Sequence, residues 1–215
     1  MPFKNREEAG RLLVEPLISY RDHSRGIIVA LPRGGVAVGY QLSVGLHLPL
    51  DVFIAQKLGA PDDPEYALGA VDETGAILLN TDAPAAYHLS QADVEDMARL
   101  QHQEITRRQH LYRQDRQLPT LTDRIVILVD DGIATGSTFF ATVRSLRHLD
   151  PRRLIGAIPV GPIETIRKVR AQVDELCVLA TPDPFYAVGS HYLDFSQVND
   201  HEVVEYLHMA ERSRC

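Results

Sequence analysis

The chain has 215 residues, of which 45% are hydrophobic and 24% are charged, a composition typical of a soluble protein with one folded domain. Its formal net charge of −7 makes a nucleic-acid-coating protein a poor fit, so an anionic ligand would need local basic groups and backbone N–H groups. The sequence has no apolar run long enough to span a membrane, no apolar signal region and no metal-type cysteine spacing, so we expect a cytoplasmic protein.

The first part of the chain alternates helical patterns with short apolar runs. Residues 6–20 have the apolar spacing of a helix. The continuous apolar run from Gly26 to Leu31 predicts a strand that is buried on both faces. A helix over about residues 36–46 follows it, and a second buried strand is predicted at Asp51–Ala55. This order of elements is typical of a parallel sheet with helical crossovers.

The second part of the chain continues the same alternation. Ser90 opens a long helix that reaches about residue 117, with Asp93 in the capping-box position. The most apolar strand is predicted at Ile125–Val129, and the remaining elements are a helix at 138–149, strands at 154–159 and 176–180, and a last helix at 200–212. We therefore expect an α/β fold, an open parallel sheet with helices on both faces, whose ligands bind at the carboxyl ends of the strands.

The segment from Ile127 to Thr138 contains the most informative motif. A buried strand ends in the adjacent acids Asp130 and Asp131, whose diverging side chains can reach both hydroxyls of a ribose diol or a hydrated metal. The following loop offers hydroxyls and unobstructed backbone N–H groups at a helix N-terminus, which suits a phosphate. An acid pair or a Thr-Gly-Ser-Thr cap alone is commonly a plain turn, but the ordered combination favours a ligand site.

This motif resembles the signature of the type I phosphoribosyltransferase family, which binds 5-phosphoribosyl-1-pyrophosphate (PRPP). The resemblance implies that Asp130 and Asp131 hold the ribose hydroxyls and contact Mg²⁺ through PRPP or water. It also implies a PRPP-binding loop made of Gly132, Ala134, Thr135, Gly136, Ser137 and Thr138. Family members that act on 6-oxopurines often carry an Asp at the position of Ala134, so the resemblance implies a different nitrogenous acceptor.

Two basic residues follow the first two predicted strands. Arg33, with Gly34 and Gly35, lies at the same predicted sheet edge as Asp130, where the glycines permit close approach to an anion and the guanidinium can bind phosphate oxygens. Lys57 follows the second strand as a candidate second cation for pyrophosphate. The catalytic set we expect is thus Arg33, Lys57, Asp130 and Asp131. A plain turn and a solvated lysine are the alternative interpretations.

The resemblance extends over nearly the whole chain and implies its domain organisation. The PRGG, KLGAP, VDDGIATGST and PFYAVG blocks are similar to a bacterial group of predicted phosphoribosyltransferases with no settled acceptor. We expect one domain over residues 1–215, with a flap at about 58–117 and a C-terminal hood at about 181–212. In the hood, Phe185 or Tyr186 would stack on the acceptor base and Asp183 would accept from its ring N–H, unless these aromatics are core anchors.

The helix at about 90–117 carries several basic residues whose role is less specific. A solvated or oligomer-facing surface is the expected role of Arg99, Arg107, Arg108, Arg113 and Arg116. We expect a homodimer that binds small molecules and neither membrane nor nucleic acid. The expected activity is transfer of the phosphoribosyl group to a nitrogen nucleophile, with Mg²⁺ and without a protein nucleophile. The alternative is a PRPP-sensing regulatory protein that kept the fold and lost the transfer.

Overall fold

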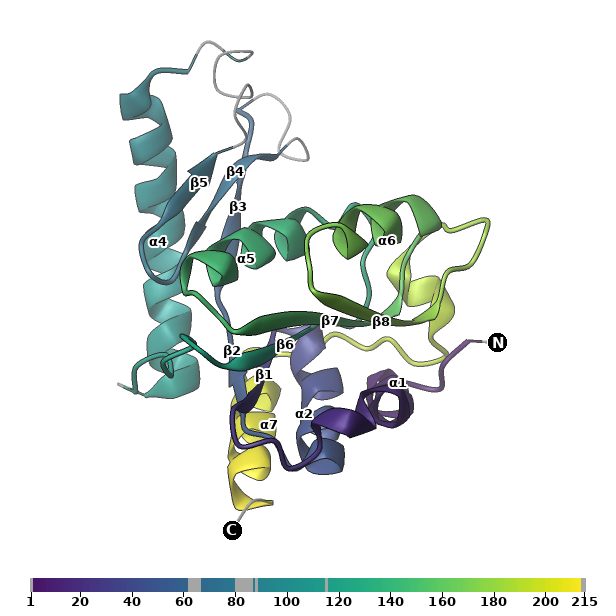
Figure 1. Ribbon diagram of the computed structural model, residues 1–215. Coiled ribbons are helices and arrows are strands. Elements are labelled where there is room, and N and C mark those ends of the chain that lie inside the picture. The colour runs from purple at the N-terminus through teal and green to yellow at the C-terminus, as the bar shows by residue number, and fades with distance from the viewer. Residues whose placement is uncertain (1, 62–66, 80–86, 88, 115, 214–215) are drawn as a thin grey trace.

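A computed structural model describes residues 2–61, 67–79, 87, 89–114 and 116–213, and these residues form two sheets (Figure 1). The larger sheet is parallel throughout, with neighbouring strands in the order β2 (Leu50–Val52), β1 (Gly26–Ala30), β6 (Ile125–Val129), β7 (Arg153–Val160) and β8 (Glu175–Ala180). The predicted open parallel sheet is therefore confirmed. Its central strands are buried along their whole length because helices cover both faces.

The helices divide between the two faces of this sheet (Figure 1). One face packs against α1 (Arg6–Val14), the 3-10 helix η1 (Glu15–Tyr20) and α2 (Gly34–Leu46). The opposite face packs against α5 (Ser137–His148) and α6 (Ile163–Arg170). Alternate strand residues enter the two cores, so that Ile127 faces α2 while Leu128 faces α5.

The smaller sheet is antiparallel and lies beside one edge of the larger one (Figure 1). Its strands are β3 (Ala55–Gly59), β4 (Ala67–Asp72) and β5 (Ile77–Leu79). Helix α4 (Gln91–Arg113) contacts this sheet and also the C-terminal helix α7 (Asp200–Arg212). The segment predicted as a flap, about 58–117, contains β4, β5 and α4, and parts of it (62–66, 80–86, 88 and 115) lie outside the described residues.

Several element boundaries differ from the prediction. The strand predicted at Asp51–Ala55 is divided, because residues 50–52 belong to the larger sheet and Ala55 begins the smaller one. The helix predicted over residues 6–20 becomes a 3-10 helix at Glu15, next to Pro16, which lacks a backbone N–H. The capping box of Ser90 and Asp93 is confirmed, but the helix ends at Arg113, where Gln114 adopts a left-handed conformation.

One arginine of α4 contradicts the expectation of a solvated or oligomer-facing row. The Arg113 side chain is only 3% exposed and contacts Glu73 and Asp51, whereas Arg99 and Arg107 are exposed. Acids from two other elements pair with it, which a helical pattern alone cannot reveal. Among the helices of the described residues, none has the length and apolar character needed to cross a membrane.

Candidate functional site

The predicted ligand loops meet at one edge of the larger sheet. Strands β1 and β6 are parallel neighbours in which Ala30 is paired with Val129, so both strands end at the same level. The Leu31 backbone N–H extends this pairing by donating to the Val129 carbonyl at 2.9 Å. The turn that contains Arg33 therefore begins beside the acid pair, as the sequence predicts.

A cavity of about 230 Å³ opens at this edge. It is lined by Lys57, Asp130, Gly132, Ile133, Ala134, Thr135, Gly136, Ser137, Thr138 and Phe139. The lysine comes from the smaller sheet, and all the other residues come from the loop after β6 and the start of α5. One cation, one carboxylate and a small-residue loop at a helix N-terminus thus share a single depression, which is an arrangement suited to a phosphorylated sugar.

The loop after β6 depends on glycine at a defined position. Gly136 caps α5 with a φ of 77°, in the left-handed region that glycine enters without steric cost. An added Cβ there would lie 2.8 Å from the Phe140 ring and 2.9 Å from Thr165. The Thr135 and Ser137 hydroxyl oxygens are 3.2 Å apart, so both face the same small region of the loop.

Gly34 and Gly35 bring the first turn against the acid pair. A Cβ added at Gly35 would lie 2.8 Å from the Val129 carbonyl, and one added at Gly34 would lie 1.9 Å from Asp131 Oδ2. These glycines therefore permit close contact between the turn and the acids. The peptide bond between Pro32 and Arg33 is cis.

Arg6 is a site residue that sequence reasoning missed. Its Nε donates to Asp131 Oδ2 at 2.6 Å, and its Nη1 donates to the Ser196 carbonyl at 2.7 Å. Its guanidinium carbon also lies 3.7 Å from the centroid of the Phe195 ring. The carboxylate of Asp131 thus faces Arg6, while Asp130 lines the cavity. The two acids, which the resemblance gave one shared role, occupy different surroundings.

The acid pair is electrostatically unequal. Burial raises the pKa of Asp130 well above its ordinary range, and the adjacent charge of Asp131 raises it further. Burial also raises the pKa of Asp131, but the Arg6 guanidinium opposes that change. The Asp131 backbone N–H donates to Asp130 Oδ1 at 2.9 Å, and the Tyr192 hydroxyl donates to the Asp131 carbonyl. Asp130 is therefore the acid that more readily holds a proton when no cation lies beside it.

Arg33 lies at the expected edge, but its side chain points to α7. Its Nη1 is 3.7 Å from Asp200 Oδ1. The Asp200 carboxylate also accepts from the Tyr112 hydroxyl at 2.6 Å and from Arg107 Nη2 at 3.1 Å. Lys57 lines the cavity directly, so the two predicted cations are not equivalent in this structure.

The residues predicted to bind the acceptor differ in how exposed they are. Phe185 is partly buried and stacks on His191, with ring centroids 5.1 Å apart, whereas Tyr186 is 82% exposed. Asp183 is exposed at the start of the same segment. The segment reaches the cavity loop farther on, because a Cβ added at Gly132 would lie 2.5 Å from Val188 Cγ1. Phe185 therefore anchors this C-terminal segment, and of the two predicted aromatic residues Tyr186 is the one whose ring remains accessible.

Comparison with known proteins gives consistent results along the chain. A model of the phosphoribosyl transferase domain matches residues 5–188. A Mycobacterium tuberculosis protein with the provisional name phosphoribosyl transferase is 39% identical over 210 residues, which cover 98% of this chain and 47% of that protein. The same values hold for its counterpart in a second strain. The chain therefore spans about half the length of the curated relatives it matches.

Solved structures agree with this sequence relationship. The crystal structure of TT1426 from Thermus thermophilus has a TM-score of 0.86 and 37% identity, and covers 96% of this chain and 98% of its own. AQ2163 from Aquifex aeolicus has a TM-score of 0.53 at 12% identity, covering 94% of this chain and 84% of its own. The first similarity covers nearly the whole chain, and the second concerns the fold alone.

Proposed function

The chain belongs to the phosphoribosyl transferase domain family, and from this premise we propose that it transfers the 5-phosphoribosyl group of PRPP to a nitrogen nucleophile. Pyrophosphate is the second product. The observation that carries the proposal is the cavity lined jointly by Lys57, Asp130 and the loop from Gly132 to Thr138. A cation, a ribose-binding acid and a phosphate loop are the groups that PRPP requires.

Each lining group has a proposed role in this transfer. The backbone N–H groups and hydroxyls of residues 134–138 bind the 5′-phosphate at the N-terminus of α5. Asp130 accepts a hydrogen bond from a ribose hydroxyl. Asp131, whose carboxylate is held in place by Arg6, accepts from the second hydroxyl. Lys57, with the Arg33 loop, stabilises the negative charge that develops on the leaving pyrophosphate. The C1–O bond breaks as the acceptor nitrogen approaches, so positioning replaces a protein nucleophile.

Mg²⁺ would bind at this cavity through oxygen atoms of the substrate as well as of the protein. Within the described part of the chain, no cluster of three or more His, Cys, Asp or Glu residues could hold a metal by itself. PRPP oxygens together with Asp130, directly or through water, would supply the hard oxygen ligands that Mg²⁺ requires. When bound, Mg²⁺ adds positive charge beside the leaving pyrophosphate.

The proposed acceptor is a nucleobase other than a 6-oxopurine. Ala134 lies in the cavity lining and offers no carboxylate to handle a purine proton. The exposed ring of Tyr186 provides a surface on which a planar base can stack. Efficient formation of IMP or GMP from PRPP by the purified protein would refute this part of the proposal.

A PRPP-sensing regulatory role is the second candidate, and one observation favours it. The Arg33 guanidinium lies near Asp200, so Lys57 is the predicted cation that lines the cavity. A protein that only senses PRPP needs to bind the sugar phosphate but needs less charge beside the leaving group.

One experiment separates these functions. Calorimetry measures PRPP binding with Mg²⁺, and a coupled assay measures pyrophosphate release across a panel of bases and amines. Asp130→Asn should weaken PRPP binding strongly, while Asp123→Asn, at an exposed acid paired with Arg25, should not. Acceptor-dependent release supports transfer, and binding without release for any acceptor supports sensing. Absence of PRPP binding to the wild-type protein would contradict both functions.

A further inference from the structure

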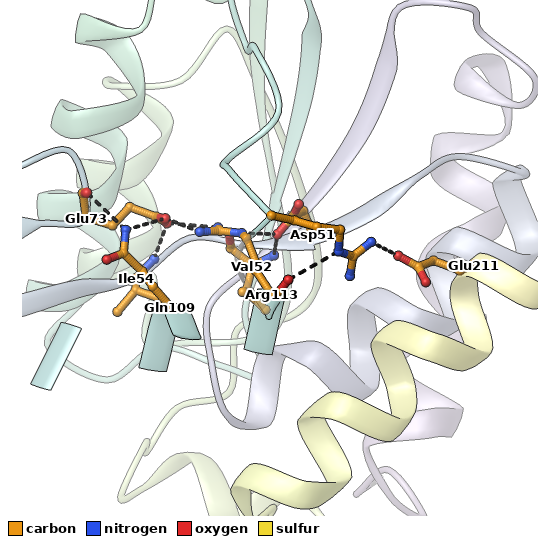
Figure 2. A network of polar contacts seen from close by, with 8 residues as sticks. Asp51, Val52, Ile54, Glu73, Gln109, Arg113 and Glu211 are labelled. Carbon is orange, nitrogen blue, oxygen red and sulfur yellow. Dashed lines mark hydrogen bonds and ion pairs between the residues drawn. The ribbon is translucent and has the colours of Figure 1, made fainter. Parts of the chain in front are cut away.

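A buried ion network lies where the chain passes from the larger sheet to the smaller one (Figure 2). Strand β2 ends at Val52 and β3 begins at Ala55, so Phe53 and Ile54 form the whole junction. The Ile54 backbone N–H donates to Glu73 Oε1 at 2.8 Å, and the Glu73 N–H donates to the Ile54 carbonyl at 2.9 Å. Glu73 directly follows β4, so these two bonds attach the junction to the smaller sheet.

Arg113 joins the two sides of this junction. Its Nε donates to Asp51 Oδ1 at 2.8 Å, and its Nη2 donates to Glu73 Oε1 at 3.0 Å. Further contacts run from its Nη1 to Glu73 Oε2 and from its Nη2 to the Val52 carbonyl. Figure 2 shows the guanidinium between Asp51 and Glu73. One side chain of α4 therefore binds an acid of β2, the carbonyl that ends β2, and the acid that follows β4 of the smaller sheet.

Stability alone does not explain why this junction contains buried charges. The Arg113 and Glu73 side chains are 3% and 1% exposed, and burying such charges is costly unless the pairing is well formed. An apolar group of similar volume could fill the same space without that cost. A bidentate guanidinium–carboxylate pair, however, fixes a direction as well as a distance. The network thus restrains the angle at which β3 leaves β2.

Lys57 is the cavity residue that depends on this angle. It lies three residues beyond Ile54 in β3, where it is paired with Ala70 of β4. It lines the same cavity as Asp130, which directly follows β6 of the larger sheet. The distance between the lysine and the acid therefore depends on how the two sheets are held at the junction.

We propose that Arg113 and Glu73 are positioning residues that place Lys57 at the PRPP cavity through the Asp51–Arg113–Glu73 network. The proposal rests on the proposed function in one respect, since it assigns Lys57 to the binding of the pyrophosphate group. Neither Arg113 nor Glu73 is among the residues that line that cavity. Their effect on binding should therefore pass through Lys57.

The test is a double-mutant cycle on PRPP affinity. Glu73→Gln keeps an oxygen that can accept from Ile54 and removes the charge that binds Arg113. We expect it to weaken PRPP binding on the order of tenfold in the wild-type background and by less than about twofold in the Lys57→Met background. Equal losses in both backgrounds would show that the network acts on the whole fold and would overturn the proposal.

A matched control comes from the exposed end of the same network. Arg116 pairs with Glu211 at the surface, where both side chains are about half exposed. Arg116→Gln should leave PRPP affinity within about twofold of the wild-type value, because an exposed pair contributes little. If Glu73→Gln melts below the assay temperature, Asp51→Asn takes its place in the cycle.

A second readout does not depend on PRPP. The chain has three lysines, Lys4, Lys57 and Lys168, so reductive ¹³C-methylation gives a small set of resonances. The Lys57 resonance should shift in Glu73→Gln, while those of Lys4 and Lys168 stay in place. An unchanged Lys57 resonance would overturn the proposal. If the wild-type protein binds no PRPP, the proposed function fails, and this resonance alone decides whether the network positions Lys57.

Discussion

Asp130 and Asp131 are adjacent in the chain, yet they differ in what surrounds them. Asp131 is paired with Arg6, whereas Asp130 lines the cavity with Lys57. The sequence motif located both acids correctly at the end of a buried strand. It could not separate them, because Arg6 lies 125 positions away and belongs to no recognisable pattern. Which acid a distant cation neutralises is a property of the folded chain.

Replacing Asp130 should stabilise the protein at neutral pH. The folded-state pKa of Asp130 is raised above its unfolded value, so the native state holds this proton more tightly than the unfolded state. The contribution of this group to stability is therefore most favourable at low pH and falls as the pH rises through the folded-state pKa. We expect Asp130→Asn, which keeps the acceptor oxygen without the charge, to raise the Tm at pH 7 by roughly 2–4 °C.

The measurement is the difference in Tm between Asp130→Asn and wild type from about pH 4 to about pH 8. The difference should grow with pH, while PRPP affinity falls at every pH. Asp123→Asn, at an exposed acid, should show no such trend. A mutant Tm below the wild-type value throughout the range would show that the ionised Asp130 carboxylate does not destabilise the folded state.

Removing the Arg6 side-chain charge should have the opposite effect on stability. Arg6→Gln leaves the largely buried Asp131 carboxylate without its partly buried partner, and we expect a loss of about 2–3 kcal/mol in the free energy of unfolding at pH 7. Arg11→Gln on the same helix is the matched control. That side chain is 60% exposed and 3.8 Å from Glu7, so its loss should cost under about 0.5 kcal/mol. Equal losses in urea unfolding would contradict a specific role for Arg6.

Helices and strands were predictable where the residues that specify them lie within the element itself. The apolar run Ile125–Val129 and the capping box at Ser90 both specify their elements within a few residues, and both are confirmed. The run Asp51–Ala55 was predicted wrongly as one strand, because a continuous apolar segment contains no signal for a change of sheet. The side chains that pair beside this change of sheet, Arg113 and Glu73, lie outside the segment itself.

The hood segment contains two adjacent aromatic residues with different expected roles. Phe185 packs on His191 and a buried cluster, so Phe185→Ala should lower stability by about 2–4 kcal/mol. Tyr186 is largely exposed, so Tyr186→Ala should leave the Tm unchanged. Loss of a stacking ring should instead weaken acceptor binding by about ten- to a hundredfold. Melting temperature and the KM for the acceptor are measured on both variants. A Tyr186→Ala variant with an unchanged KM would remove Tyr186 from the acceptor site.

At the scale of the whole molecule, the two sheets should differ in local stability. Helices cover both faces of the larger sheet, and its central strands are buried throughout. The smaller sheet has three strands and is joined to the larger one through residues 53 and 54. Native-state hydrogen exchange should therefore show lower opening free energies for β3–β5 than for β1, β6 and β7.

Substitution of Arg113 should widen this difference. Arg113→Met removes the link between Asp51 and Glu73, so protection in β3–β5 should fall while protection in β6 changes little. Arg99→Met, at an exposed position of the same helix, is the control. A uniform loss of protection across both sheets would mean that the molecule opens as one cooperative unit.

The family match ends at Val188, but residues that follow it contact the acid pair, its partner Arg6 and the arginine turn. Tyr192 donates to the backbone of Asp131, the Ser196 carbonyl accepts from Arg6, and Asp200 lies beside Arg33. This C-terminal stretch is therefore a natural crossover point for chimaeras between relatives. An exchange there would alter what supports the acid pair and the arginine turn while leaving every residue of the signature unchanged. Recombination at this one position would therefore test how far the support of the two loops tunes the cavity while Lys57, Ala134 and Tyr186 stay constant.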